Sequence, residues 1–349
     1  MTRHTIMVAV LALLAFTWIQ CSDEPTDKPA RKPPRYKPLP DTPLRDEPEA
    51  RGTEPRVALK IAYPSGTFQM VADQDTESTV KVTSGGKSRT QDMTQKVTQW
   101  LTLEVARPDA KGSRTITVRF TRFRMAMDAG LVSVALDTDN PKSLAKNPTG
   151  KLLQAMMKAT PVMRRDADGN ITSVRGMDRI VKDIVAADPN AAQMAGELKE
   201  FLSDETMTAM IAQAQKFMPT GPVGVGAVWY GQAAMPVPMI GQLDCRTKCK
   251  LTTLEKTSAG RIAALAIRMK AESTGGKTVQ MGAAAMNVDS ATMRTAGTME
   301  LDVETGLMRK TVNRVTGRFA LSLRSARRQT TEMDITMNGE QTITVTPAK

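Results

Sequence analysis

The chain has 349 residues, of which 24% are charged, and its formal net charge at neutral pH is +12. Its one histidine is His4, at the start of an apolar segment. If that segment is removed, the protein lacks the residue on which most triad nucleophiles, neutral-pH general bases and zinc sites depend. Aromatic residues make up only 4% of the chain, so the positive charge does not indicate a nucleic-acid partner.

The N-terminal segment has the pattern of an export signal. Arg3 and His4 precede an unbroken apolar run, residues 6–16, which is followed by Thr17, Trp18, Ile19 and Gln20. As a helix, residues 5–19 would reach only about 22 Å, whereas the hydrocarbon core of a bilayer is roughly 30 Å thick. We therefore predict that residues 1–20 are a signal peptide.

Cys21 follows this segment directly and resembles the lipid-attachment cysteine of bacterial lipoproteins from uncharacterised envelope families. Gln20 departs from that pattern, which usually has a small residue before the cysteine. The resemblance implies a lipid on Cys21 that anchors the chain to a membrane. Ser22, in place of Asp, implies export to the periplasmic face of the outer membrane. The alternatives are an ordinary cleaved signal and an uncleaved anchor.

Residues 21–56 are predicted to form a disordered tether. From Ser22 to Arg56 there are nine prolines, eight basic and eight acidic residues. Such a composition buries too little apolar surface to offset the entropy of ordering. As polyproline II at about 3.1 Å per residue, the tether would reach on the order of 100 Å.

Residues 57–349 are predicted to form one β-rich domain, with strands over 57–137, a helical insert over 149–219 and strands again over 222–346. Residues 89–106 alternate with period two, and a change of parity near Thr121 indicates a β-bulge. Asn338-Gly339 lies between two alternating runs and predicts a final type I′ hairpin. One-sided apolar stripes place the helices on a sheet. The predicted class is α+β: an antiparallel sheet or open barrel with a helical layer from the middle of the chain.

Few residues suggest a metal or catalytic site. Asp166, Asp168 and Asn170 could supply oxygen ligands, but their spacing lacks the glycine and closing glutamate of a calcium loop, so we predict a plain hairpin turn. We expect no metal, no cofactor and no catalytic residue. A cleft with two facing buried carboxylates would favour an enzyme instead.

Cys245 and Cys249 are the remaining thiols. Export to an oxidising compartment favours a disulfide between them. On a straight strand, however, their α-carbons would lie about 13 Å apart, beyond the reach of a disulfide. The pair is therefore bridged across a sharp turn or stays reduced.

Basic residues gather late in the chain. Because they share one parity, opposite to the apolar residues of the same predicted strand, they would form one basic sheet face; they are Lys310, Arg314, Arg318, Arg324 and Arg328. This face suits anionic lipid head groups or cell-wall polymers. A solvated face that keeps the protein soluble is the alternative.

We therefore expect an envelope-anchored lipoprotein with a non-enzymatic binding or structural role. The alternative is a carrier that holds a lipid or another hydrophobic ligand in an open barrel. The chain's 24 methionines suit an adaptable apolar pocket as well as an ordinary core.

Overall fold

The computed structural model describes residues 44–45, 47–130, 133–145, 148–187, 199, 202–215, 217–237, 241–258, 260–273, 278–281, 284–324 and 330–348. Within these residues the strands form one 13-stranded sheet. They are β1 (Gly66–Ser84), β2 (Lys87–Val105), β3 (Arg114–Asp128), β4 (Ser133–Asp137), β5 (Val162–Arg165), β6 (Ile171–Arg175), β7 (Val228–Val237), β8 (Gly241–Thr257), β9 (Gly260–Ser273), β10 (Thr278–Met281), β11 (Ala284–Asp302), β12 (Met308–Arg324) and β13 (Thr330–Pro347). The helices are α2 (Pro141–Ala145), α3 (Pro148–Lys158), α4 (Met177–Ala187) and α6 (Asp204–Gln215).

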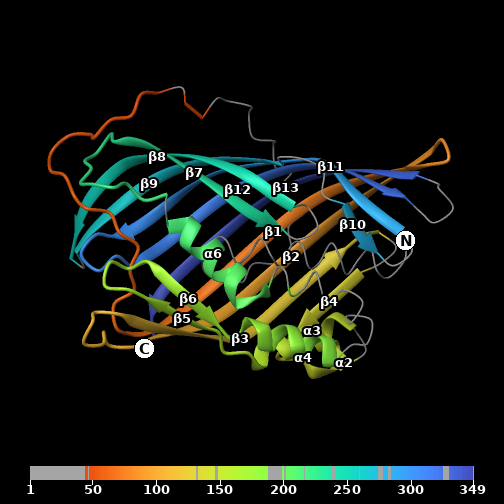
Figure 1. Cartoon of the computed structure of the whole chain (residues 1–349), viewed down its shortest axis with the longest axis horizontal. Coiled ribbons are helices and arrows are strands. Elements are labelled where there is room, and N and C mark those ends of the chain that lie inside the picture. Colours follow the sequence, from red (N-terminus) through yellow and green to blue (C-terminus); the bar gives the residue numbers. More distant parts are fainter. Residues whose placement is uncertain are drawn as a thin grey trace.

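The sheet is antiparallel at every pairing and follows the order β6-β5-β3-β2-β1-β13-β12-β11-β9-β8-β7, with β4 on β3 and β10 on β11. Most neighbours are consecutive in the chain, whereas β1 and β13 come from opposite ends of the described residues and pair in the middle of the sheet (Figure 1). A strand of 19 residues such as β1 extends over about 60 Å.

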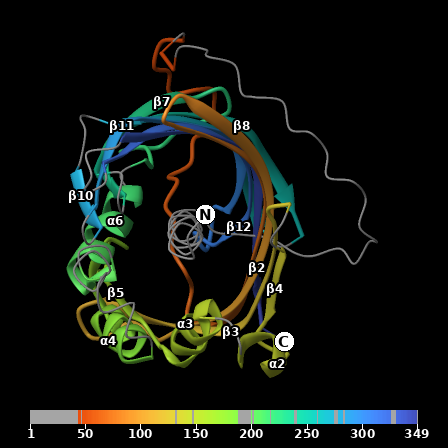
Figure 2. The same ribbon diagram turned by 90° about the vertical axis from the view of Figure 1, so that its right-hand side faces the viewer.

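The sheet curls strongly, so that one face is turned inward and the other outward (Figure 2). Period-two alternation explains why each strand has an inner and an outer side. On β2, for example, Leu101 and Leu103 are buried, while Trp100 and Thr102 next to them are more exposed. The inner face therefore carries the core, and most charged residues lie outside.

The predicted α+β class is wrong. The described helices have only 5 to 12 residues, and they do not form a layer over the sheet. Instead, α6 lies against β6 and β7, the two edge strands of the sheet, and α3 packs on β3 and α4. Apolar stripes reveal that a helix packs against something, but they do not reveal that the partner is the edge of a much longer sheet.

The α6 contacts are specific. The hydroxyl of Thr208 on α6 accepts a hydrogen bond from the backbone N–H of Val174 on β6 at 2.7 Å. Just beyond α6, the carbonyl oxygen of Phe217 accepts one from the indole N–H of Trp229 on β7 at 2.8 Å. Helix α6 and the residues after it therefore connect the two edges of the curled sheet (Figure 2).

The bulge predicted near Thr121 is confirmed, whereas the hairpin predicted at Asn338-Gly339 is wrong. In the β2–β3 ladder the partners pass from Phe120 to Arg122, which leaves Thr121 as the extra residue. Asn338 and Gly339 lie inside the continuous strand β13, paired on both sides. A Cβ on Gly339 would meet the carbonyl oxygen of Asp75 at 2.6 Å, so this glycine permits close approach of β1 instead of a turn.

A segment before β1 closes one end of the curled sheet. Val57 pairs with Val223 and Ala50 with Val228 through backbone hydrogen bonds. Folded structure therefore begins before residue 57, the domain boundary predicted from composition. Backbone hydrogen bonds hold these residues in place. Such bonds do not depend on side-chain type, so a proline-rich composition with few apolar residues does not reveal them. We call residues 47–65 the end segment.

Two arginines fix the far part of the end segment. The guanidinium of Arg165, which is 5% exposed, donates to the carbonyl oxygens of Ile61 and Gly169, both at 2.7 Å. Arg114 donates to the carbonyl oxygen of Tyr63 at 2.9 Å. Burial lowers the pKa of Arg165, and Tyr63 and Asp166 act against that shift. These contacts join the end segment to β3 and β5.

Candidate functional site

The inner face of the sheet is the candidate site, and in its central strands it carries no charge. Inward positions are those whose side chains share the face of the buried core residues. Every described inward position is uncharged in six stretches: residues 68–84 of β1, 243–251 of β8, 263–273 of β9, 286–301 of β11, 311–323 of β12 and 331–345 of β13. Such a surface suits an uncharged or apolar partner.

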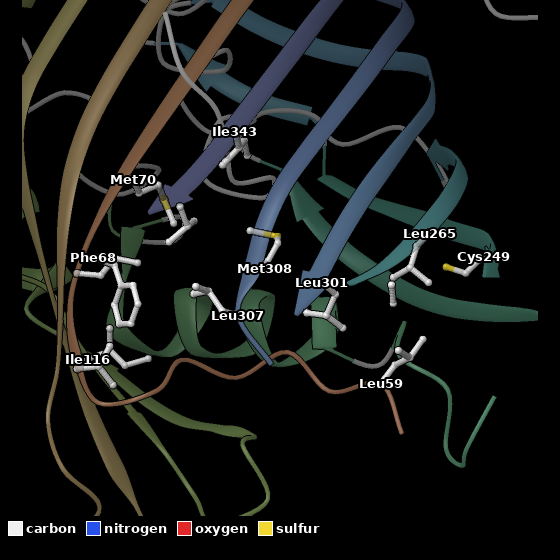
Figure 3. Close-up of a cluster of buried hydrophobic side chains, with 14 of the residues drawn as sticks. Leu59, Phe68, Met70, Ile116, Cys249, Leu265, Leu301, Leu307, Met308 and Ile343 are labelled. Carbon is white, nitrogen blue, oxygen red and sulfur yellow. The ribbon is translucent and has the colours of Figure 1, made fainter. Parts of the chain in front are cut away.

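At the end closed by the end segment, the inner face is apolar and filled. Leu59 of the end segment lies among side chains from several strands, including Leu265 and Leu301 (Figure 3). Phe68, Met70 and Ile343 continue the cluster across β1 and β13 (Figure 3). This part is an ordinary packed core, in which the end segment supplies the second layer.

A second apolar cluster lies on the inner face of β8, β9, β11, β12 and β13. Its described members all belong to the sheet itself: Leu243, Cys245, Met269, Ala271, Val288, Ala291, Met293, Phe319 and Met337, with Val315, Leu321 and Ile335 beside them. No described helix or loop residue takes part. We call this group the sheet cluster.

Between the two clusters runs a band of uncharged polar side chains, which we call the polar belt. Gln74 on β1 faces Gln341 on β13, and Gln341 faces Asn313 on β12. On the other side, Thr295 of β11 and Thr247 of β8 both face Met269 of β9. The full belt is Gln74, Thr76, Gln95, Gln99, Thr247, Thr295, Thr311, Asn313 and Gln341.

Several belt atoms lack hydrogen-bond partners among the described residues. They are Oε1 of Gln74 and Gln341 and Oγ1 of Thr247 and Thr295. Thr247, Thr295 and Gln341 are only 2%, 4% and 4% exposed. A buried polar atom without a partner costs about 1 to 3 kcal/mol. Four such atoms on one face are therefore a large expense for a fold that is stable by only about 5 to 15 kcal/mol.

The polar belt was not found from the sequence. Period-two patterns treat a polar residue in a strand as outward, so Gln74 and Gln341 look like solvent-facing positions. Alternation along the strand could have identified these glutamines as inward. Gln341 lies on the same side of its strand as Ile343 and Val345, and Gln74 lies on the same side as Met70 and Ala72.

Cys245 and Cys249 are not bridged; each is a free, buried thiol. Both face inward from the extended strand β8, four residues apart, so the pair is reduced and not bridged across a sharp turn. Burial raises the pKa of Cys245 to about 11, with Asp244 adding to the shift, and raises that of Cys249 to about 12. Both thiols therefore stay protonated at neutral pH.

The other predicted site residues do not form one site. Lys310, Arg314, Arg318 and Arg324 are exposed on the outer face of β12, away from the polar belt. Cys21 and Arg328 lie outside the described residues.

The predicted turn at residues 166–170 is confirmed as the β5–β6 connection. The carboxylate of Asp166 accepts the backbone N–H of Asn170 at 2.8 Å, which closes the turn. Within the described residues there is no group of three or more potential metal ligands, and Asp302 is the one carboxylate in the buried core. No described helix is long and apolar enough to cross a membrane.

The fold and inner face together define an all-β protein with a single curled antiparallel sheet. The family model for a family of unknown function, DUF6263, matches residues 111–308, which is more than half of the chain. The chain therefore belongs to the DUF6263 family. Comparison with curated proteins finds no match.

Solved structures give only distant likenesses. A structure of lipovitellin, titled for its lipid–protein interactions, is 9% identical with a TM-score of 0.40, and the match covers 82% of this chain but 26% of that one. A DUF1329 family protein from Desulfovibrio piger is 9% identical, with coverages of 76% and 83% and a TM-score of 0.14. The COG4313 outer membrane channel from Pseudomonas putida is 8% identical, with coverages of 82% and 97% and a TM-score of 0.17. At these scores none of them assigns an activity.

Proposed function

We propose that this protein is a non-enzymatic binding protein of the cell envelope, and that its inner sheet face holds a hydrophobic ligand bearing an uncharged polar group. The observation that carries this proposal is the set of buried belt oxygens without partners beside the sheet cluster. The sheet cluster would contact the apolar part of the ligand. The belt would bind its polar group.

The chemistry of the belt narrows the ligand class. The unpartnered atoms are two amide oxygens and two hydroxyls, which bind hydroxyl or amide groups well. No charged side chain on the inward positions of the central strands is available to neutralise a carboxylate or a phosphate. A buried unpaired charge is far more costly than a neutral polar group. We therefore favour an uncharged amphiphile, such as a monoacylglycerol, over a fatty acid.

We expect the full chain to bind monooleoylglycerol more tightly than oleate. The double change Thr295→Val and Gln341→Leu is expected to weaken monooleoylglycerol binding about tenfold, since each lost hydrogen bond contributes about 0.5 to 1.5 kcal/mol. The same change is expected to leave the ligand-free protein equally or more stable, because it removes unpartnered polar atoms. Displacement of a fluorescent acyl probe measures affinity, and urea unfolding measures stability.

Thr298→Val is the matched control, because Thr298 lies on the same strand as Thr295 but is exposed on the outer face. It should change neither affinity nor stability. Tighter binding of oleate than of monooleoylglycerol would contradict the proposal. So would equal affinity in the double variant and the unchanged protein.

We also propose that the chain is anchored to a membrane through a lipid on Cys21, as its sequence resemblance implies. Mass spectrometry of the protein purified from its own cells should show an N-terminal peptide that begins at Cys21 and carries acyl chains. The variant Cys21→Ser should lack that added mass and leave the membrane fraction. A peptide that retains unmodified Met1 would exclude both lipidation and signal cleavage.

A further inference from the structure

The outer face of the sheet gathers basic residues from four neighbouring strands. In one row, Arg246 on β8 faces Lys270 on β9, and Lys270 faces Arg294 on β11. Residues directly opposite each other in an antiparallel pair have Cβ atoms about 5 Å apart, and like charges there are destabilising. Three cations in register across three strands therefore require a compensating interaction.

A second row lies two residues further along the strands. Lys248 on β8 faces Arg268 on β9, and both Arg268 and Arg314 of β12 face Ala296 of β11. Four adjacent strands span about 14 Å at a strand spacing of about 4.8 Å. We call the two rows together the basic patch: Arg246, Lys248, Arg268, Lys270, Arg294 and Arg314. Lys248 is only 6% exposed, so the other five side chains form the accessible part of the patch.

The described carboxylates balance only part of the basic patch. Glu47 of the end segment pairs with Lys248 at 3.2 Å, and Glu272 pairs with Lys270 at 2.9 Å. Arg246, Arg268 and Arg314 are exposed and make no ion pair with a described residue. Glu340 lies opposite Arg314 in the ladder without reaching it as an ion pair. The patch therefore keeps an excess of positive charge.

We propose that the basic patch binds the head groups of an anionic lipid bilayer. The patch extends in two directions, across four strands and along them, so it matches a surface of charges better than a single polymer chain. It replaces the strip along β12 that the sequence suggested, of which only Arg314 joins the patch. That prediction missed five residues of the patch: Arg246, Lys248, Arg268, Lys270 and Arg294. They alternate with inward residues on their strands, and this alternation is the sequence signal that could have identified them. The proposal does not depend on a ligand at the inner face.

The test uses the full chain with Cys21→Ser, so that no acyl chain holds it to lipid. Flotation should show binding to phosphatidylcholine vesicles that contain about 30 mol% phosphatidylglycerol and little binding to pure phosphatidylcholine. Each basic residue near an anionic surface strengthens binding about fivefold. Changing Arg246, Arg268 and Arg314 to Gln is therefore expected to weaken binding to the anionic vesicles about 100-fold.

The matched control changes Lys81, Lys87 and Arg89 to Gln, which removes the same charge from the exposed β1–β2 hairpin. This control should keep most of the binding, and about 0.5 M salt should abolish it in the unchanged protein. Equal losses in the two triple variants would overturn the proposal, because net charge alone would then explain binding. Binding to soluble polyglutamate as tight as to the anionic vesicles would also overturn it.

Discussion

Leu59→Asp is expected to lower the free energy of unfolding by more than about 4 kcal/mol, as measured by urea unfolding followed by circular dichroism. Leu59 is 5% exposed and lies in the cluster that joins the end segment to the sheet. The substitution removes a buried apolar side chain and places a carboxylate among the apolar side chains of the cluster. Trp229 belongs to the same cluster, so its fluorescence should report the same transition.

The control for this prediction is the neighbouring substitution Ala58→Asp. Ala58 is exposed, and its change should alter stability by no more than about 0.5 kcal/mol. If Leu59→Asp cost less than about 1 kcal/mol, the end segment would not belong to the cooperative core.

Gly224→Ala is expected to destabilise the protein by about 3 kcal/mol. A Cβ at this position would lie 1.6 Å from the carbonyl oxygen of Thr53, and the next nearest atoms are also backbone atoms of Thr53. No side chain can move aside to relieve the contact. The two chains would have to separate, at the expense of the hydrogen bond from Gly224 N–H to the carbonyl oxygen of Arg51.

Gly221→Ala tests whether close backbone contact is the cause. At Gly221 the nearest atom to a new Cβ is a guanidinium nitrogen of Arg51 at 3.2 Å, and this long side chain can move. We expect a loss below about 1 kcal/mol there, again by urea unfolding. Similar losses at the two glycines would show that backbone entropy, and not the contact with Thr53, governs both.

Local patterns predicted many of the elements but not the class of fold. The alternation of residues 89–106 and the parity change at Thr121 are properties of single strands, and both appear in the structure. The pairing of β13 on two sides is a long-range property, and it overrides the local turn preference of Asn338-Gly339. The apolar stripes predicted helices, but not what each helix packs against: α6 contacts the edge strands β6 and β7, whereas α3 contacts β3 and α4.

The candidate site was harder to predict because it depends on curvature. A sheet that curls has two faces of different character, and only the structure tells which face a glutamine occupies. The basic patch was hard to predict for a related reason: it depends on strand pairing. The neighbouring strands β8, β9, β11 and β12 bring together basic residues that are far apart in the chain. Spacing along one strand identified Arg314 alone among the six residues of the basic patch.

The pairing of β1 with β13 has a consequence for how the chain reaches its native state. Ser84 and Thr331 lie 247 residues apart in sequence, yet they are neighbours across this pair. Until β13 is available, β1 remains a long open edge to which strands of another molecule can add. Closing so large a loop is also slow. A newly synthesised molecule would therefore be most prone to aggregate before its last strand is in place, and a holding chaperone would act best at that stage.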